Sequence, residues 1–112
     1  MKIETRTVGE ITILDFSGQI TLGEGTKEVR DTVRGILDKG GNKIILNLGG
    51  VNYIDSSGVG EMVSTFASVT NKGGQLRLVH LTKRIKEMLT ITKLLTVFQS
   101  FEDEQEAIAS FG

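Results

Sequence analysis

Hydrophobic and polar residues alternate at the beginning of the chain, which is the pattern of a half-buried β-strand. Two such runs, residues 3–8 and 11–17, flank the pair Gly9-Glu10. Glycine tolerates a positive φ angle at the first turn position, so this pair suits a two-residue type II′ turn. The sequence therefore predicts an antiparallel hairpin at the start of the chain.

Four later segments carry apolar residues at the spacing of one helix face. The first has a candidate N-cap at Thr26 and a stop at Gly40-Gly41, with the apolar positions Val29, Val33, Ile36 and Leu37. The second follows the serines at 56 and 57 and stops at residues 71–74, with the apolar positions Val59, Met62, Val63, Phe66 and Ala67. Both patterns predict amphipathic helices.

The third helix is expected over residues 82–92, with Ile85, Met88 and Leu89 facing inward. The fourth opens with the acidic run 102–106, which suits the positive end of the helix dipole, and its buried stripe is Ala107, Ile108 and Phe111.

Three further strands are predicted between these helices. Residues 43–48 form a near-continuous apolar run, as expected of a central parallel strand covered on both faces. Residues 75–80 and 96–100 complete the set. The order β-β-α-β-α-β-α-β-α predicts one α/β domain over residues 1–112, with a mixed, mostly parallel sheet of about five strands and four helices.

Composition narrows the possible functions. Thirteen basic and fourteen acidic residues nearly cancel, so no nucleic-acid partner is indicated. The chain has no cysteine and one histidine, which argues against a metal centre, and no cofactor is expected. The N-terminus lacks the features of a signal peptide, and no apolar run is long enough to insert in a membrane. We expect a soluble, cytoplasmic protein.

The motif Asp55-Ser-Ser-Gly-Val-Gly60 between a strand and a helix raises the question of serine catalysis. The Gly-x-Ser-x-Gly elbow of α/β-hydrolases is absent at both serines. The only histidine, His80, ends another strand among apolar residues and is a poor candidate for the general base. The sequence therefore predicts no enzyme.

Two glycine patterns elsewhere are also interpreted as structural. In Gly23-Glu-Gly25 the third glycine of a dinucleotide-binding loop is replaced by Glu28, whose carboxylate would repel a pyrophosphate. The pairs Gly49-Gly50 and Gly73-Gly74 lack the Gly-Lys-Ser/Thr of a phosphate loop and are expected to be turns.

Helix capping is the simplest role for Asp55-Ser56-Ser57, because aspartate and serine are preferred N-caps. Capping needs only one of the three residues, and it does not explain Gly58 and Gly60, each of which weakens a helix by about 1 kcal/mol relative to alanine. Glycines at these positions leave the first helical turn bare, so another protein could approach it closely. A serine hydroxyl on such a turn would be accessible to a kinase.

At these residues the sequence resembles the STAS domains of bacterial anti-sigma factor antagonists. The specific part of the resemblance is the run from Asp55 to Gly60, and the matching segments extend over nearly the whole chain, from Gly18-Gln-Ile20 to Glu106-Ala-Ile108. The family commonly has aspartate where this chain has Thr21 and Asn47, and those acids flank the partner-facing end.

The resemblance implies a regulatory domain that binds an anti-sigma factor when unmodified and so releases a sigma factor. The anti-sigma factor would be a serine kinase related to histidine-kinase ATPases, and it would phosphorylate Ser56, with Ser57 as the alternative acceptor. A metal-dependent serine phosphatase would reverse the reaction. The partner-binding residues would be Thr21, Asp55, Ser56, Ser57, Gly58, Val59, Gly60 and Glu61. The alternative is a STAS accessory subunit of a membrane transporter, or another partner-switching regulator that does not act on a sigma factor.

Overall fold

The computed structural model describes residues 1–111, which form five strands and four helices in the predicted order. The elements are β1 (Lys2–Val8), β2 (Ile11–Ile20), α1 (Glu24–Asp38), β3 (Lys43–Ile54), α2 (Ser56–Asn71), β4 (Gln75–Val79), α3 (Lys83–Ile91), β5 (Gln99–Phe101) and α4 (Glu104–Ala109).

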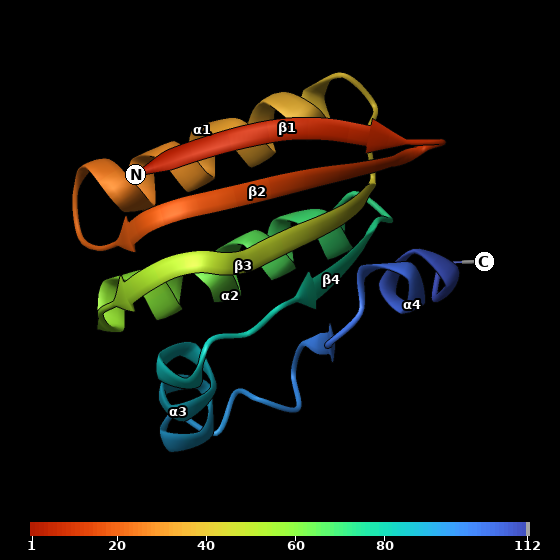
Figure 1. Ribbon diagram of the computed structural model, residues 1–112. Helices are drawn as coiled ribbons and strands as arrows, with labels where there is room; N and C mark the ends of the chain where they lie inside the picture. The colour runs from red at the N-terminus through yellow and green to blue at the C-terminus, as the bar shows by residue number, and fades with distance from the viewer. Residues whose placement is uncertain (112) are drawn as a thin grey trace.

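The strands form one sheet in the order β1-β2-β3-β4-β5 (Figure 1). β1 runs antiparallel to β2, and every other neighbouring pair is parallel. Val8 pairs with Ile11 across the turn, where Gly9 has the positive φ of 60° that a type II′ turn needs. The predicted hairpin and the mostly parallel sheet are confirmed.

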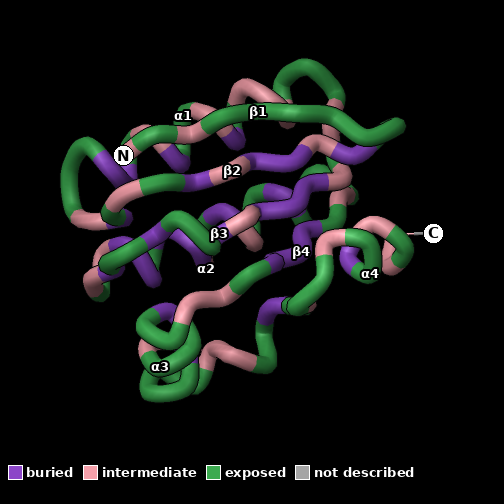
Figure 2. The backbone as a smooth tube through the Cα atoms, in the orientation of Figure 1, coloured by how far each residue is buried: buried purple, intermediate pink, exposed green. Residues whose placement is uncertain are grey.

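The two faces of the sheet carry apolar clusters of different size. The larger cluster joins β2, β3 and β4 to α1, α2 and α3, with Leu46 and Met62 fully buried. The smaller cluster lies under α4 and consists of Ile11, Ile13, Ile45, Val79 and Ala107. Burial is concentrated in β2, β3 and β4, whereas the edge strand β1 is exposed along most of its length (Figure 2).

Several predicted boundaries are wrong. Gly49-Gly50 lies inside β3, because this strand continues beside β2 for six residues past the predicted end at residue 48. β5 begins at Gln99, since residues 95–97 form a turn. Thr26 is not an N-cap: α1 is capped by Gly23, and the buried Thr26 hydroxyl donates to the Gly23 carbonyl at 3.1 Å.

The predicted apolar face of α2 is also incomplete. Ala67 is exposed, whereas Glu61, Thr65 and Val69 are buried. The difference arises because α2 packs against α1 as well as against the sheet, so part of its buried surface faces another helix.

Candidate partner-binding site at the start of helix α2

The carboxyl ends of β2 and β3 lie side by side, with Ile20 paired to Ile54 at the end of their ladder. The Asp55 amide extends this pairing by donating to the Ile20 carbonyl at 3.4 Å. The chain then enters α1 after β2 and α2 after β3 (Figure 1). The loop at residues 21–23 and the first turn of α2 are therefore neighbours.

Asp55 connects this loop to α2 through both carboxylate oxygens. Its Oδ1 accepts from the Gly58 amide at 2.8 Å, which caps the helix, and its Oδ2 accepts from the Leu22 amide at 3.2 Å. These N–H groups, that of Gly58 above all, hold the pKa of the Asp55 carboxyl below its ordinary value. Of the three capping candidates Asp55, Ser56 and Ser57, the structure therefore uses Asp55 as the N-cap.

The two serines and Thr21 differ in accessibility. Ser56 is the first residue of α2 and is exposed, while Ser57 and Thr21 are half-buried. Because Asp55 already caps the helix, the Ser56 hydroxyl is not needed for that role. The site thus offers an exposed hydroxyl at a helix N-terminus, where an added negative charge is electrostatically favoured.

Gly58 and Gly60 are present for different reasons. A Cβ atom at Gly58 would overlap the Ile20 carbonyl oxygen and lie 2.7 Å from Cγ1 of Ile54, so the helix packs directly on the end of β2. Gly60 is exposed, and a Cβ atom added there would meet nothing within 4 Å. The interpretation of both glycines as a cleared docking surface is therefore wrong for Gly58 and stays a prediction for Gly60.

Val59 and Glu61 point into the protein. Val59 is 4% exposed and belongs to the large cluster. Glu61 is 8% exposed, and its Oε1 accepts from the Arg30 guanidinium of α1 at 2.9 Å. Glu61 is thus part of the contact between α1 and α2, and its charge is balanced by Arg30.

The structure adds three exposed side chains that the sequence patterns did not single out. Leu22, next to Asp55, is 77% exposed, and Tyr53, near the end of β3, is 41% exposed. The Arg84 guanidinium of α3 lies over the Tyr53 ring, 4.8 Å from its centroid. The sequence does contain an indication for Leu22, because this apolar residue stands in the loop between Thr21 and Gly23, where exposure is expected. Of these side chains, Leu22 lies beside the N-cap of α2 and places an exposed apolar group next to the residue that precedes Ser56.

His80 and Asn47 lie elsewhere. The His80 Nδ1 is 3.1 Å from Oδ1 of Asn47, and Asn47 also donates to Asp15 at 2.8 Å. Asn47 is seven residues before the end of β3, which corresponds to about 23 Å along a strand. His80 is therefore remote from Ser56, and Asn47 does not flank the predicted site as the family pattern implied.

Within residues 1–111, no group of three or more metal-ligating side chains comes together. The helices of this same part of the chain are all too short or too polar to cross a bilayer.

Comparison with known proteins decides the family. The STAS domain model matches residues 2–107. The chain belongs to the STAS family. This STAS domain is 38% identical over 72 residues to a protein of Thermotoga neapolitana named as a candidate anti-sigma factor antagonist, and the match covers 64% of this chain and 64% of that relative.

Solved structures agree on the fold. A candidate anti-sigma factor antagonist of Thermotoga maritima matches the STAS domain with a TM-score of 0.88 and 27% identity, over 96% of this chain and 92% of that one. The anti-sigma factor antagonist SpoIIAA matches in its unphosphorylated form with a TM-score of 0.74 and 19% identity, over 98% and 97% of the two chains. The phosphorylated form of SpoIIAA from Bacillus matches with a TM-score of 0.75 and 18% identity, over 99% of this chain and 100% of that one. The fold predicted from the family resemblance is confirmed.

Proposed function

We propose that this STAS domain is a cytoplasmic anti-sigma factor antagonist that is switched by phosphorylation of Ser56. In the unmodified state it binds an anti-sigma factor and so releases a sigma factor. That partner is a serine kinase of the histidine-kinase-like ATPase class, and a metal-dependent phosphatase restores the binding form. The domain acts by binding and carries out no catalysis of its own.

The observation that carries this proposal is that Ser56 is exposed and directly follows Asp55, the N-cap of α2. The Asp55 carboxylate is held in place by the amides of Leu22 and Gly58. The names of the Thermotoga relatives support the same role. Ser56, Leu22 and Gly60 are exposed at this end of the sheet and form the proposed partner-binding surface.

Phosphorylation would act on the interface and leave the fold intact. A phosphate adds about −1.5 to −2 charges at pH 7. The exposed Ser56 side chain has room for it, and SpoIIAA shares this fold in both its modified and unmodified forms. The phosphate would lie beside the ionised Asp55 carboxylate and would turn a weakly charged surface into an acidic one. A partner that binds this surface must then remove two neighbouring negative groups, the phosphate and the Asp55 carboxylate, from water, and this weakens binding.

The test uses the purified anti-sigma factor kinase of the source organism. With ATP, the parent domain is expected to gain one phosphate by mass spectrometry, and Ser56→Ala is expected to gain none. The phosphorylated domain should keep its far-UV spectrum and bind the kinase at least about thirtyfold more weakly, a loss of about 2 kcal/mol.

Two matched variants decide the acceptor. Ser57→Ala removes the neighbouring hydroxyl, and Ser64→Ala removes another exposed serine of α2. Both should be phosphorylated like the parent. If Ser56→Ala is still phosphorylated and Ser57→Ala is not, the phosphoacceptor is Ser57 and the proposal for Ser56 is wrong. Specific binding to a transporter ATPase, with no phosphorylation, would favour the alternative role as a transporter subunit.

A further inference from the structure

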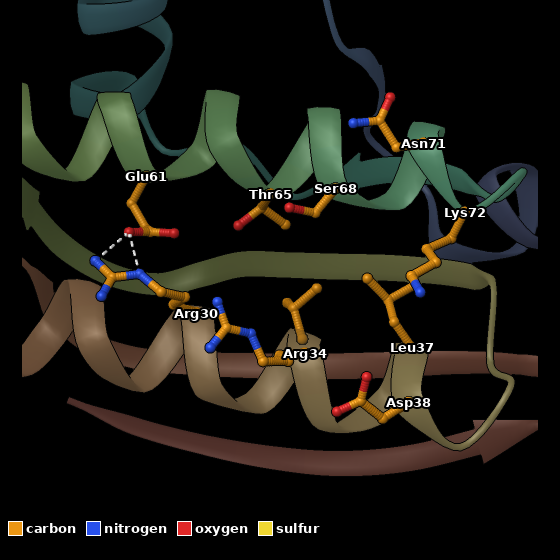
Figure 3. Close-up of a pocket in the computed structure, with 10 residues that line it drawn as sticks. Arg30, Arg34, Leu37, Asp38, Glu61, Thr65, Ser68, Asn71 and Lys72 are labelled. Atoms are coloured by element: carbon orange, nitrogen blue, oxygen red, sulfur yellow. Dashed lines mark hydrogen bonds and ion pairs between the residues drawn. The ribbon is translucent and has the colours of Figure 1, made fainter.

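A groove of about 500 Å³ lies between α1 and α2 (Figure 3). Its volume falls within the range of about 300–1,000 Å³ that small-molecule sites occupy. Of the proposed partner-binding residues, the groove includes only the buried Glu61. It is therefore a separate feature of the surface, and the proposed phosphorylation of Ser56 does not explain it.

The wall formed by α2 contains an unsatisfied hydroxyl. Thr65 is 3% exposed, and its Oγ1 has no hydrogen-bond partner among the described residues. Figure 3 shows this side chain between the two helices, facing the Arg34 side chain of α1. A buried hydroxyl without a partner destabilises the protein that contains it, and an acceptor atom in the groove would remove that cost.

The charges of the groove suit a single negative charge. The cations are Arg30, Arg34 and Lys72, and the carboxylates are Asp38 and Glu61, so one positive charge is left over. Arg30 is already paired with Glu61, whereas Arg34 has no ion-pair partner within residues 1–111. A ligand with several negative charges, such as a nucleotide, would be repelled by the two carboxylates.

We propose that this groove binds a small organic monocarboxylate with an apolar or aromatic body. The ligand carboxylate accepts from the Arg34 guanidinium, whose fork of N–H donors matches its two oxygens, and from the Thr65 hydroxyl. The apolar body lies against Val33 and Leu37, the two aliphatic side chains in the lining. The site is independent of the phosphorylation proposed above.

The experiment is a titration of the ¹⁵N-labelled domain with 3-phenylpropionate, followed by amide chemical shifts. We expect saturable shifts confined to α1 and α2 around the groove. The uncharged analogue 3-phenylpropanol and inorganic phosphate should each bind at least about tenfold more weakly. The alcohol lacks the carboxylate, and phosphate lacks the apolar body. No saturable shift, shifts centred elsewhere, or equal binding of the alcohol or of phosphate would each overturn the proposal.

Variants test the two polar contacts. Arg34→Gln and Thr65→Val should each weaken 3-phenylpropionate binding by about tenfold, while the matched controls Arg84→Gln and Thr70→Val, both outside the groove, should bind like the parent. Thr65→Val should fold at least as stably as the parent, because it replaces an unsatisfied hydroxyl by a methyl group of similar size. Parent-like binding by both groove variants would refute the assigned site.

Discussion

At the scale of single residues, Gly58 and Gly60 belong to the same motif but serve different purposes. Gly58 lets α2 approach the Ile20 carbonyl, which a side chain would block. Gly60 is exposed and has open space around it, so alanine fits there without contact. The two positions therefore separate a requirement of the fold from a requirement of function.

Substitution by alanine should distinguish them. Gly58→Ala is expected to lower the free energy of unfolding by about 3 kcal/mol, because the new methyl group overpacks the contact with β2. Gly60→Ala should raise it by up to about 1 kcal/mol, because alanine is the better helix former. Urea unfolding measures both. Equal effects of the two substitutions would contradict the packing argument.

Leu22 is an exposed apolar side chain next to Asp55, the residue that precedes Ser56. Leu22→Ser should leave the free energy of unfolding nearly unchanged and weaken anti-sigma factor binding at least about tenfold, since burying a leucine contributes about 1.5–3 kcal/mol. Val8→Ser is the control, because Val8 is also exposed but lies at the opposite end of the sheet, beside Ile11. Isothermal calorimetry provides the affinities, and equal losses for the two variants would exclude Leu22 as an anchor.

At the scale of elements, Arg6 joins the edge strand β1 to β2 and α4. Its guanidinium donates to Asp15 at 2.6 Å and to Glu104 at 2.5 Å. These hydrogen bonds hold the pKa values of both carboxyls below their ordinary values, and they raise the pKa of Arg6 itself. The contact ties the outermost strand to the last helix.

The pH dependence of stability follows from the direction of these shifts. A depressed carboxyl pKa contributes stability above the unfolded value, which is about 4 for both residues, and this contribution is lost as the pH falls through the folded pKa. Arg6→Gln should therefore lower the free energy of unfolding by about 1 kcal/mol at pH 7, a modest amount because the groups are partly exposed.

The deficit of Arg6→Gln should shrink as the pH is lowered below about 4, where the carboxyls are protonated in both proteins. Urea unfolding at neutral and acidic pH measures this change. Lys2→Gln, which removes the exposed pair between Lys2 and Glu4, is the control and should have little effect at either pH. A deficit that is independent of pH would show that Arg6 stabilises the domain by packing instead.

At the scale of the whole molecule, stability depends on covering both faces of the sheet. α4 covers the smaller cluster through Ala107, which is fully buried, while Ala109 on the same helix is exposed. Ala107→Asp should lower the free energy of unfolding by at least about 3 kcal/mol, because it places an unpaired charge among apolar side chains.

Ala109→Asp is the matched control and should change stability by less than about 0.5 kcal/mol. Thermal unfolding, together with the binding of a dye that reports exposed apolar surface, tests the pair. Equal stability of the two variants would show that α4 is not required to close this face.

The order of the elements, the hairpin turn and most buried positions were predictable from the sequence, because they depend on local spacing. The alternation in residues 3–8 and 11–17 and the apolar run at 43–48 each indicate a strand without reference to a partner. The exposed serine after Asp55 was also predictable, since the motif is short and lies at a strand-to-helix junction.

Only the tertiary structure decided the contacts between elements. The second half of β3 has no apolar run, and it is a strand because it pairs with β2 past two register shifts. Glu61 is charged in sequence but buried in the fold, since Arg30 of another helix neutralises it. In the sequence, Gly58 resembles a residue of a docking surface. The structure places the Ile20 carbonyl beside it and shows that it is needed for packing instead. Local patterns determine which elements form, whereas packing between residues distant in sequence determines what each side chain contacts.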